Sequence, residues 1–188
     1  MPSTRLDHDW FSRPLPENVR IGKGSWLYSS YAFVHYGSKT STGLRAGQES
    51  GLYHGTFFDF GANAEIEIGD YCSLVGVIFS TNGRVTIGDY TFIAHEVVIA
   101  DSHWATPVEN SNQHASSRGS TTQNVVEIGR NVWIGAKAIV IGSVKIGEGA
   151  VIGAGTLVTH DIPPYAVCVG NPMKIARSGE ARPLPLNP

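Results

Sequence analysis

The sequence predicts an all-β protein built as a parallel β-helix, in which short strands wind into stacked coils. Aliphatic residues recur at every sixth position from Ile128, in the blocks IGRNVW, IGAKAI, VIGSVK, IGEGAV, IGAGTL and VTHDIP. Glycine often follows the aliphatic residue, and the chain of 188 residues holds 22 glycines, which indicates many turns or close backbone contacts. An α-helix does not explain this period, because at 3.6 residues per turn residues spaced six apart do not fall on one face of the helix.

Each block reads as one short strand followed by a turn. The first position is aliphatic in all six blocks: Ile128, Ile134, Val140, Ile146, Ile152 and Val158. The fifth is mostly small or β-branched: Val132, Ala138, Val144, Ala150, Thr156 and Ile162. We expect three blocks to form one coil of about 18 residues, with strands of successive coils about 4.8 Å apart. Both positions then point into a core along the axis.

The same pattern occurs earlier in the chain, and it defines the expected domain. Blocks begin at Ile68, Leu74 and Ile87, and a fainter start is visible in IGKGSWLYSSYA from Ile21. We therefore expect an N-terminal cap or tail over 1–20 and a β-helix over 21–163. A C-terminal cap with a proline-rich tail is expected over 164–188.

Two segments interrupt the period. Residues 36–60 keep it poorly and are expected to be an irregular insertion, and a polar loop is expected over about 104–122. A long excursion from a solenoid is usually functional. It can also be a tolerated insertion, because long loops add little closure entropy. We favour a function for the loop because of the histidine that precedes it.

Composition excludes several classes of protein. The chain carries 14 Lys and Arg against 16 Asp and Glu, so it lacks the basic surface that nucleic-acid binding requires. No apolar run approaches the roughly 18 residues of a membrane span, and the N-terminus lacks the apolar region of a secretory signal. Two cysteines, Cys72 and Cys168, form no disulfide framework. These features predict a cytoplasmic protein.

His103 lies where the last regular block ends and the polar loop begins. A neutral imidazole at this place is suited to accept a proton at cytoplasmic pH. Asp101, two residues earlier, would point the same way in an extended chain and could orient the ring. The alternative for Asp101 is a turn aspartate that bonds its own backbone.

Other reactive residues test rival chemistries. His95, His103 and His114 are candidates for a metal site like that of a γ-class carbonic anhydrase. However, His95 is expected to face out of a turn, and its partners fit no short ligand motif, so we expect no metal. Cys72 occupies an inward fifth position, where a thiol is inert, and no GxSxG motif is present. A covalent intermediate on cysteine or serine is therefore disfavoured.

The blocks and the segment IGRNVWIGAKAIVIGSVKIGEGAVIGAGTLVTHDIPPYAVCVGNPMKIAR over 128–177 resemble hexapeptide-repeat acyltransferases. The resemblance is greatest to the maltose, galactoside and nodulation-type O-acetyltransferases. It implies a left-handed β-helix, a homotrimer and acetyl-CoA bound in grooves between subunits. It also implies that His103 is the catalytic base, since the family's catalytic histidine sits just before the loop that interrupts the repeat.

The resemblance further implies a donor site. Trp133 of NVWIG would border the acyl-CoA, the backbone of Ala136 and Ala154 would approach the pantetheine, and Thr159 would lie nearby. Lys174 and Arg177 would lie near the 3′-phosphate, where charge-assisted hydrogen bonds are strong. The alternatives are a plain surface aromatic for Trp133 and two solvated charges for the cations.

The acceptor side departs from the family. Where the sugar O-acetyltransferases carry a substrate-contacting asparagine, this chain has the apolar stretch SLVGVIF over 73–79. His160 stands where a basic residue is common. We expect a trimeric acetyltransferase that transfers acetyl from acetyl-CoA to a hydroxyl of a sugar or other sugar-containing small molecule. The alternatives are an N-acetyltransferase of an amino sugar, a γ-carbonic-anhydrase-like metalloenzyme and a non-catalytic β-helix scaffold.

Overall fold

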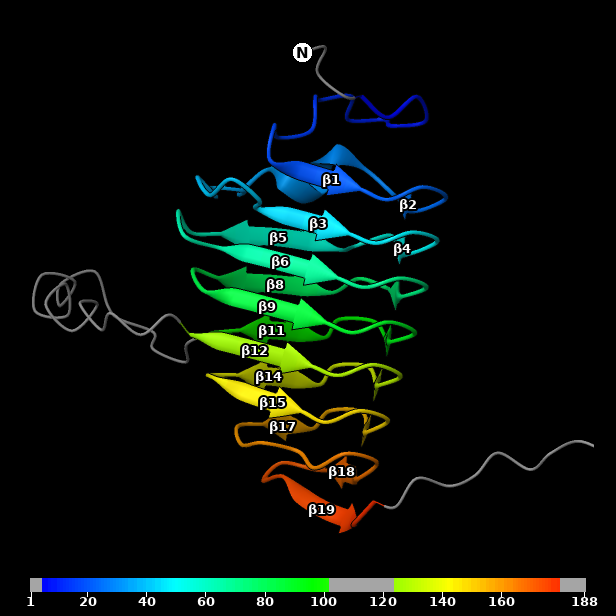
Figure 1. Cartoon of the computed structure of the whole chain (residues 1–188), viewed down its shortest axis with the longest axis vertical. Helices are drawn as coiled ribbons and strands as arrows, with labels where there is room; N and C mark the ends of the chain where they lie inside the picture. The colour runs from blue at the N-terminus through cyan, green and yellow to red at the C-terminus, as the bar shows by residue number, and fades with distance from the viewer. Residues whose placement is uncertain (1–4, 102–123, 180–188) are drawn as a thin grey trace, which may run out of the picture.

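The computed structural model describes residues 5–101 and 124–179 of the chain. Within them, short strands stack into three sheets that form the sides of one elongated coil (Figure 1). Strands at the front of Figure 1 run to the right and strands behind run to the left as the chain descends from its N-terminus. This winding is left-handed. The predicted left-handed parallel β-helix is confirmed.

We call the three sides sheets A, B and C. Sheet A contains β1 (Val19–Ile21), β3 (Leu44–Ala46), β6 (Glu65–Ile68), β9 (Arg84–Ile87), β12 (Val125–Ile128) and β15 (Val144–Ile146). Sheet B contains β2 (Trp26–Leu27), β4 (Gly51–Leu52), β7 (Ser73–Leu74), β10 (Phe92–Ile93), β13 (Trp133–Ile134), β16 (Val151–Ile152), β18 (Val167–Val169) and β19 (Lys174–Arg177). Sheet C contains β5 (Phe57–Phe60), β8 (Ile78–Thr81), β11 (Val98–Ala100), β14 (Ile139–Ile141) and β17 (Leu157–Val158). A 3₁₀ helix, η1 (Ser30–Phe33), takes the place of a sheet C strand in the first coil.

The core follows the predicted period from Ile128 onward. Every first-position and fifth-position residue of the six blocks is buried. The parallel register places Ile128 beside Ile146, and Ile134 beside Ile152, so each aliphatic side chain stacks on its counterpart one coil away. Cys72 is also buried in its expected inward position. The axial ladder read from the sequence is therefore the hydrophobic core.

The register differs from the six-residue period after Leu74. In the block LVGVIF, Ile78 would be the inward fifth residue, but it is 38% exposed, while Val77 and Phe79 are fully buried. The strand β8 pairs Phe79 with Phe58, and the two rings stack with centroids 5.4 Å apart. The inward residues Leu74 and Phe79 are five positions apart and not six, and this shorter step places the aromatic side chain of Phe79 inside.

The expected insertion over 36–60 is shorter than the sequence indicates. Residues 44–60 form a regular coil through β3, β4 and β5. Its period is hard to see because small residues, Ala46 and Ser50, fill the inward positions. The Ser50 hydroxyl donates to the Gly69 carbonyl at 2.9 Å and accepts from the Cys72 amide at 2.9 Å, which satisfies a buried polar group. Residues 36–43 carry the irregular part.

The coil also extends past the expected limits of 21–163. β1 begins at Val19, and β18 pairs in parallel with β16. β19 then turns back and pairs with β18 in the antiparallel sense. This last strand covers the edge of sheet B, which would otherwise leave unpaired backbone groups.

The outer faces of the three sheets differ in character. Sheet A is charged and carries ion pairs between Arg84 and Glu67 at 3.0 Å and between Lys145 and Glu127 at 3.2 Å. Sheet B exposes the aromatic side chains of Trp26, Phe92 and Trp133. The outward row of sheet C is apolar: Phe57, Ile78, Val98, Ile139 and Leu157. Sheet A is suited to face water, whereas contiguous apolar surface on B and C is suited to bind a ligand or a second chain.

None of the described residues forms a helix long and apolar enough to cross a membrane.

Asp9 anchors the N-terminal segment to the first coil. Its carboxylate is buried and accepts hydrogen bonds from the Ser29 hydroxyl at 2.7 Å, the Ser30 amide at 2.7 Å and the Phe11 amide at 3.0 Å. Burial alone raises the pKa of Asp9, but the hydrogen bonds from Ser30 and Ser29 outweigh it and hold the pKa well below its ordinary value. The charged form is therefore the one that stabilises the fold.

We expect Asp9→Ala to lower the free energy of unfolding by about 1 to 3 kcal/mol at neutral pH, because it leaves three donors without their acceptor. Since the folded pKa is depressed, this contribution is present above about pH 4 and is lost as the pH falls toward the folded pKa. Thermal denaturation of wild type and variant should show a difference that narrows below about pH 4. Asp7→Ala, which removes an exposed carboxylate, is the control. A difference that does not change with pH would contradict this role.

Candidate functional site

Trp133 presents its ring on the outer face of sheet B. It lies on β13 and is 55% exposed, although it is one of the largest apolar side chains in the chain. Phe92 occupies the paired position on β10, and the two rings meet edge to face with centroids 6.4 Å apart. Together they form an aromatic surface on which a flat or apolar part of a ligand can pack.

Ala136 and Ala154 lie in equivalent turns of successive coils, at the edge between sheets B and C. The turns stack closely, since the Gly155 amide donates to the Ala136 carbonyl at 2.9 Å. A side-chain carbon at Gly135 would lie 2.6 Å from the Ala154 nitrogen, so glycine is required there. The amides of Ala136 and Ala154 have no hydrogen-bond acceptor among the residues that the structure describes. Two donors with methyl side chains thus remain available to an amide-containing ligand.

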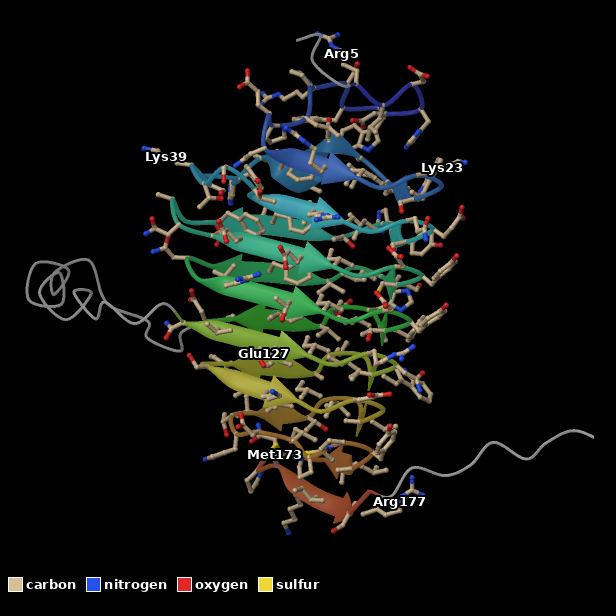
Figure 2. The ribbon with its side chains drawn as sticks, viewed as in Figure 1. Arg5, Lys23, Lys39, Glu127, Met173 and Arg177 are labelled. Carbon is tan, nitrogen blue, oxygen red and sulfur yellow. The ribbon has the colours of Figure 1, made fainter. Side chains whose placement is uncertain are left out.

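Lys174 and Arg177 place two positive charges at the C-terminal end of the coil. Both lie on β19, opposite Val169 and Val167 of β18, and both are exposed. Figure 2 shows Arg177 directed away from the body of the molecule. Neither side chain forms an ion pair within residues 5–101 and 124–179. Their charge and exposure make both of them candidates to bind an anion.

The structure brings most of the expected donor residues onto one strip. Trp133, Lys174 and Arg177 share sheet B, in which β13, β16, β18 and β19 are neighbours, so they span about 14 Å at 4.8 Å per strand. Ala136 and Ala154 border the same part of the sheet. Thr159 is apart from them. It follows the C-terminal end of β17, whereas Ala136 and Ala154 precede the N-terminal ends of the sheet C strands. Its hydroxyl is bonded to the His160 ring at 2.8 Å.

Asp101 forms part of a polar ladder at the corner between sheets C and A. Its Oδ2 accepts from the Thr81 hydroxyl at 2.9 Å and from the Asn82 amide at 2.6 Å. Asn82 does the same one coil earlier, accepting from the Asn63 amide at 3.0 Å. Asp101 therefore bonds groups of the preceding coil, and not its own backbone as the turn alternative expected. Orientation of the His103 ring by Asp101 stays a prediction, because His103 lies outside the described residues.

The metal and thiol alternatives gain little support. His95 is exposed in its turn, as expected, while His103 and His114 fall outside the described residues. Within the described part of the chain, no three His, Cys, Asp or Glu side chains come close enough to hold a metal ion. Cys72 and Cys168 are buried, and burial raises the pKa of both thiols, which makes them poor nucleophiles.

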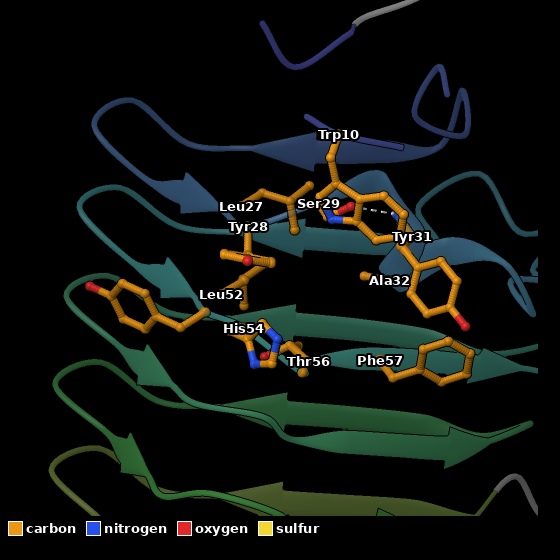
Figure 3. Close-up of a pocket in the computed structure, with 12 residues that line it drawn as sticks. Trp10, Leu27, Tyr28, Ser29, Tyr31, Ala32, Leu52, His54, Thr56 and Phe57 are labelled. Atoms are coloured by element: carbon orange, nitrogen blue, oxygen red, sulfur yellow. Dashed lines mark hydrogen bonds between the residues drawn. The ribbon is translucent and has the colours of Figure 1, made fainter. Parts of the chain in front are cut away.

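Sequence reasoning missed a groove at the opposite end of the coil. It is a cavity of about 450 Å³ at the first two coils, and its lining includes Trp10, Tyr28, Tyr31, His54 and Phe57 (Figure 3). These residues come from three segments that the repeat pattern does not connect. The signal in the sequence was the density of aromatic residues in the first third of the chain, which does not follow the six-residue period.

The fold and the repeat define the class of protein. Residues 126–160 match the family model described as bacterial transferase hexapeptide (six repeats). The galactoside O-acetyltransferase of Escherichia coli K12 is 34% identical over 121 residues, which are 64% of this chain and 57% of that protein. A protein of Staphylococcus aureus strain COL named as an acetyltransferase is 47% identical over 66 residues, or 35% of this chain and 33% of that protein. This chain therefore matches between 33% and 57% of the length of these relatives.

Solved structures agree with the sequence comparisons. A galactoside acetyltransferase in complex with coenzyme A is 26% identical, with a TM-score of 0.52 over 84% of this chain and 64% of that one. A hexapeptide-repeat acetyltransferase of Vibrio cholerae, complexed with acetyl-coenzyme A, has the same fold, with a TM-score of 0.61, 23% identity and coverage of 81% of this chain and 77% of that one. The resemblance to hexapeptide-repeat acetyltransferases is confirmed.

Proposed function

We propose that the protein is an acetyltransferase that moves an acetyl group from acetyl-CoA to a hydroxyl of a sugar or other sugar-containing small molecule. The observation that carries this proposal is the strip of donor residues on sheet B, on a chain 34% identical to a galactoside O-acetyltransferase over 121 residues. The strip offers an aromatic surface and two cations on sheet B, and at its border two amides that have no acceptor among the described residues. Acetyl-CoA presents a thioester, two amides and phosphates, which these groups complement in chemistry.

The donor would lie along the lower part of sheet B. The amides of Ala136 and Ala154 would donate to pantetheine oxygens, and Trp133 would border the acyl end. Lys174 and Arg177 would bind the 3′-phosphate by charge-assisted hydrogen bonds. Thr159, at the far side of sheet C, would contact a donor held by a neighbouring subunit.

The transfer would be direct. Neutral His103 accepts the proton from the acceptor hydroxyl as its oxygen bonds to the thioester carbonyl carbon, and backbone amides stabilise the oxyanion. The carbon–sulfur bond then breaks, and the CoA thiolate leaves and takes the proton from His103. Asp101 would hold the ring orientation from the preceding turn. Placing the two substrates side by side supplies much of the rate.

The active assembly would be a homotrimer in the cytoplasm. The aliphatic part of the outer row of sheet C, which is Ile78, Val98, Ile139 and Leu157, supports self-association, because contiguous apolar side chains are costly to leave in water. Three copies related by a threefold axis would each place sheet C against a different face of the next copy. Such a heterologous contact closes into a ring and forms three identical grooves.

Removing both cations of β19 tests the donor site. We expect the double variant Lys174→Ala and Arg177→Ala to raise the KM for acetyl-CoA by about five- to thirtyfold, which corresponds to about 1 to 2 kcal/mol for two exposed charge-assisted contacts. The turnover number should change little, because remote contacts bind the ground and transition states alike. Steady-state kinetics with acetyl-CoA as the varied substrate measures both.

Acetyl-dephospho-CoA, which lacks the 3′-phosphate, is the second donor in this experiment. Wild type should prefer acetyl-CoA, and the double variant should lose most of that preference. The control is the double variant Arg84→Ala and Lys145→Ala, which removes two cations from sheet A. It should prefer acetyl-CoA as strongly as the wild type does. Equal preference in wild type and the β19 variant would show that these residues do not bind the phosphate.

A further inference from the structure

The aromatic groove is built into the first two coils, at the edge between η1, β4 and β5. Trp10, Tyr31 and Phe57 line one side of it, with ring centroids 5.7 Å apart for Trp10 and Tyr31 and 6.1 Å apart for Tyr31 and Phe57. Tyr28 and His54 stand on the other side and meet edge to face at 4.9 Å. Figure 3 shows the two groups separated by an open space. A volume of about 450 Å³ lies within the range of small-molecule sites.

The walls of the groove are held in place before any ligand binds. Asp9, whose carboxylate accepts the hydrogen bonds of Ser29 and Ser30, fixes the chain next to Trp10. The Ser29 hydroxyl in turn accepts from the Tyr31 amide at 3.1 Å, drawn as a dashed line in Figure 3. The large side chains nonetheless stay in water, since Trp10 is 68% and Tyr31 47% exposed. Preorganised, exposed aromatic rings are a feature of binding surfaces.

The lining is neutral. Among the described residues that line the groove there is no Asp, Glu, Lys or Arg, so a phosphate would find no cation and an ammonium group no carboxylate. The polar side-chain groups include the hydroxyls of Tyr, Thr and Ser29, the indole N–H of Trp10 and the ring nitrogens of His54. Flat aromatic faces with such groups at their margins suit a ring that has an apolar face and hydroxyl groups at its rim. A neutral pyranose has this chemistry.

The groove lies away from the donor strip. In sheet B, β4 borders the groove and β13 carries Trp133, and the two are three strand spacings apart, about 14 Å along the axis. A single sugar ring in the groove would therefore not reach the acetyl group on the same face. A ring bound in the groove would have to be a different ring from the one that reacts.

We propose that the groove binds a neutral pyranose ring of an acceptor that contains at least two sugar rings, away from the hydroxyl that is acetylated. This inference rests on the proposed sugar acceptor. To the proposed function it adds the class of acceptor, which is a neutral glycan and not a nucleotide-linked or phosphorylated sugar. It also adds the place where the second ring of that acceptor binds.

Direct binding without donor tests the groove separately from catalysis. Maltose, cellobiose and lactose would be titrated into the protein and followed by saturation-transfer NMR and calorimetry. We expect at least one of them to bind, and Trp10→Ala and Tyr31→Ala each to weaken it about fivefold, the effect of one stacked aromatic ring. Both side chains are exposed, so their removal leaves the core intact, and thermal denaturation would verify this.

Tyr90→Ala is the matched control, because Tyr90 is 54% exposed and stacks on Tyr71 outside the groove. It should bind the disaccharide as wild type does. The proposal is overturned if none of the three disaccharides binds, or if both groove variants bind as wild type does. It is also overturned if UDP, which has no pyranose ring, or choline binds in a manner that depends on Trp10 and Tyr31. Loss of acetyl transfer with disaccharide binding intact would instead count against the proposed function alone.

Discussion

Replacing His103 by alanine is expected to lower the turnover number for acetyl transfer by about 100-fold or more, which is the effect of losing a general base. The variant should retain the coil and its affinity for acetyl-CoA, because the donor strip lies on sheet B and the core lies along the axis. Stopped-time assays of product formation give the turnover number, and calorimetry gives the donor affinity. A pure, folded variant with nearly normal turnover would show that another group accepts the proton.

His95→Ala is the matched control for this experiment. His95 is an exposed histidine on a turn, and it was a candidate ligand in the alternative metal site. Under the proposed mechanism the control should retain full turnover. Loss of activity in both variants, together with a bound metal in wild type, would favour the metalloenzyme.

Ile146→Asp is expected to prevent folding. Ile146 is 1% exposed on β15 and lies between Ile128 and Ile162 in the axial ladder. The substitution removes a buried aliphatic side chain, at a cost of about 2 to 5 kcal/mol, and buries a carboxylate without a partner, which adds several more. Together these costs approach the whole stability of an ordinary domain. Soluble yield, circular dichroism and thermal denaturation would report the loss.

Ile78→Asp makes the same chemical change on the outside of the coil. Because Ile78 faces outward on sheet C, this variant should fold and melt nearly as the wild type does. It should also separate the subunits if the apolar row forms the trimer interface, which light scattering would detect. A folded Ile146→Asp variant would mean that the inward register is wrong.

The sequence was sufficient to predict the axial core and the path of the coils after Ile128. The reason is physical, because stacked coils repeat the same environment every 18 or so residues and therefore select the same side chains. The prediction was less accurate where the inward position holds an unusual side chain or where a coil has a different length. Ala46 and Ser50 fill inward positions with small side chains, and at Phe79 a corner one residue shorter brings in an aromatic ring.

The candidate sites depend on contacts that the repeat does not encode. The donor strip could be expected only through the resemblance, since an exposed Trp133 or a free amide at Ala136 has no signature in the period. The aromatic groove was not predicted because Trp10 reaches Tyr31 through the N-terminal segment that Asp9 anchors, and Tyr31 contacts Phe57 of the next coil. Long-range packing of this kind is set by the fold and not by local spacing.

The most direct test of acetyl transfer measures both products of one reaction. Purified protein would be incubated with acetyl-CoA and a panel of neutral disaccharides, with release of the CoA thiol followed by a thiol reagent and the sugar analysed by mass spectrometry. We predict that thiol release depends on the sugar and that one sugar gains one acetyl group for each thiol released. Thiol release that does not depend on any acceptor, or a protein that does not bind acetyl-CoA at all, would contradict the proposed function.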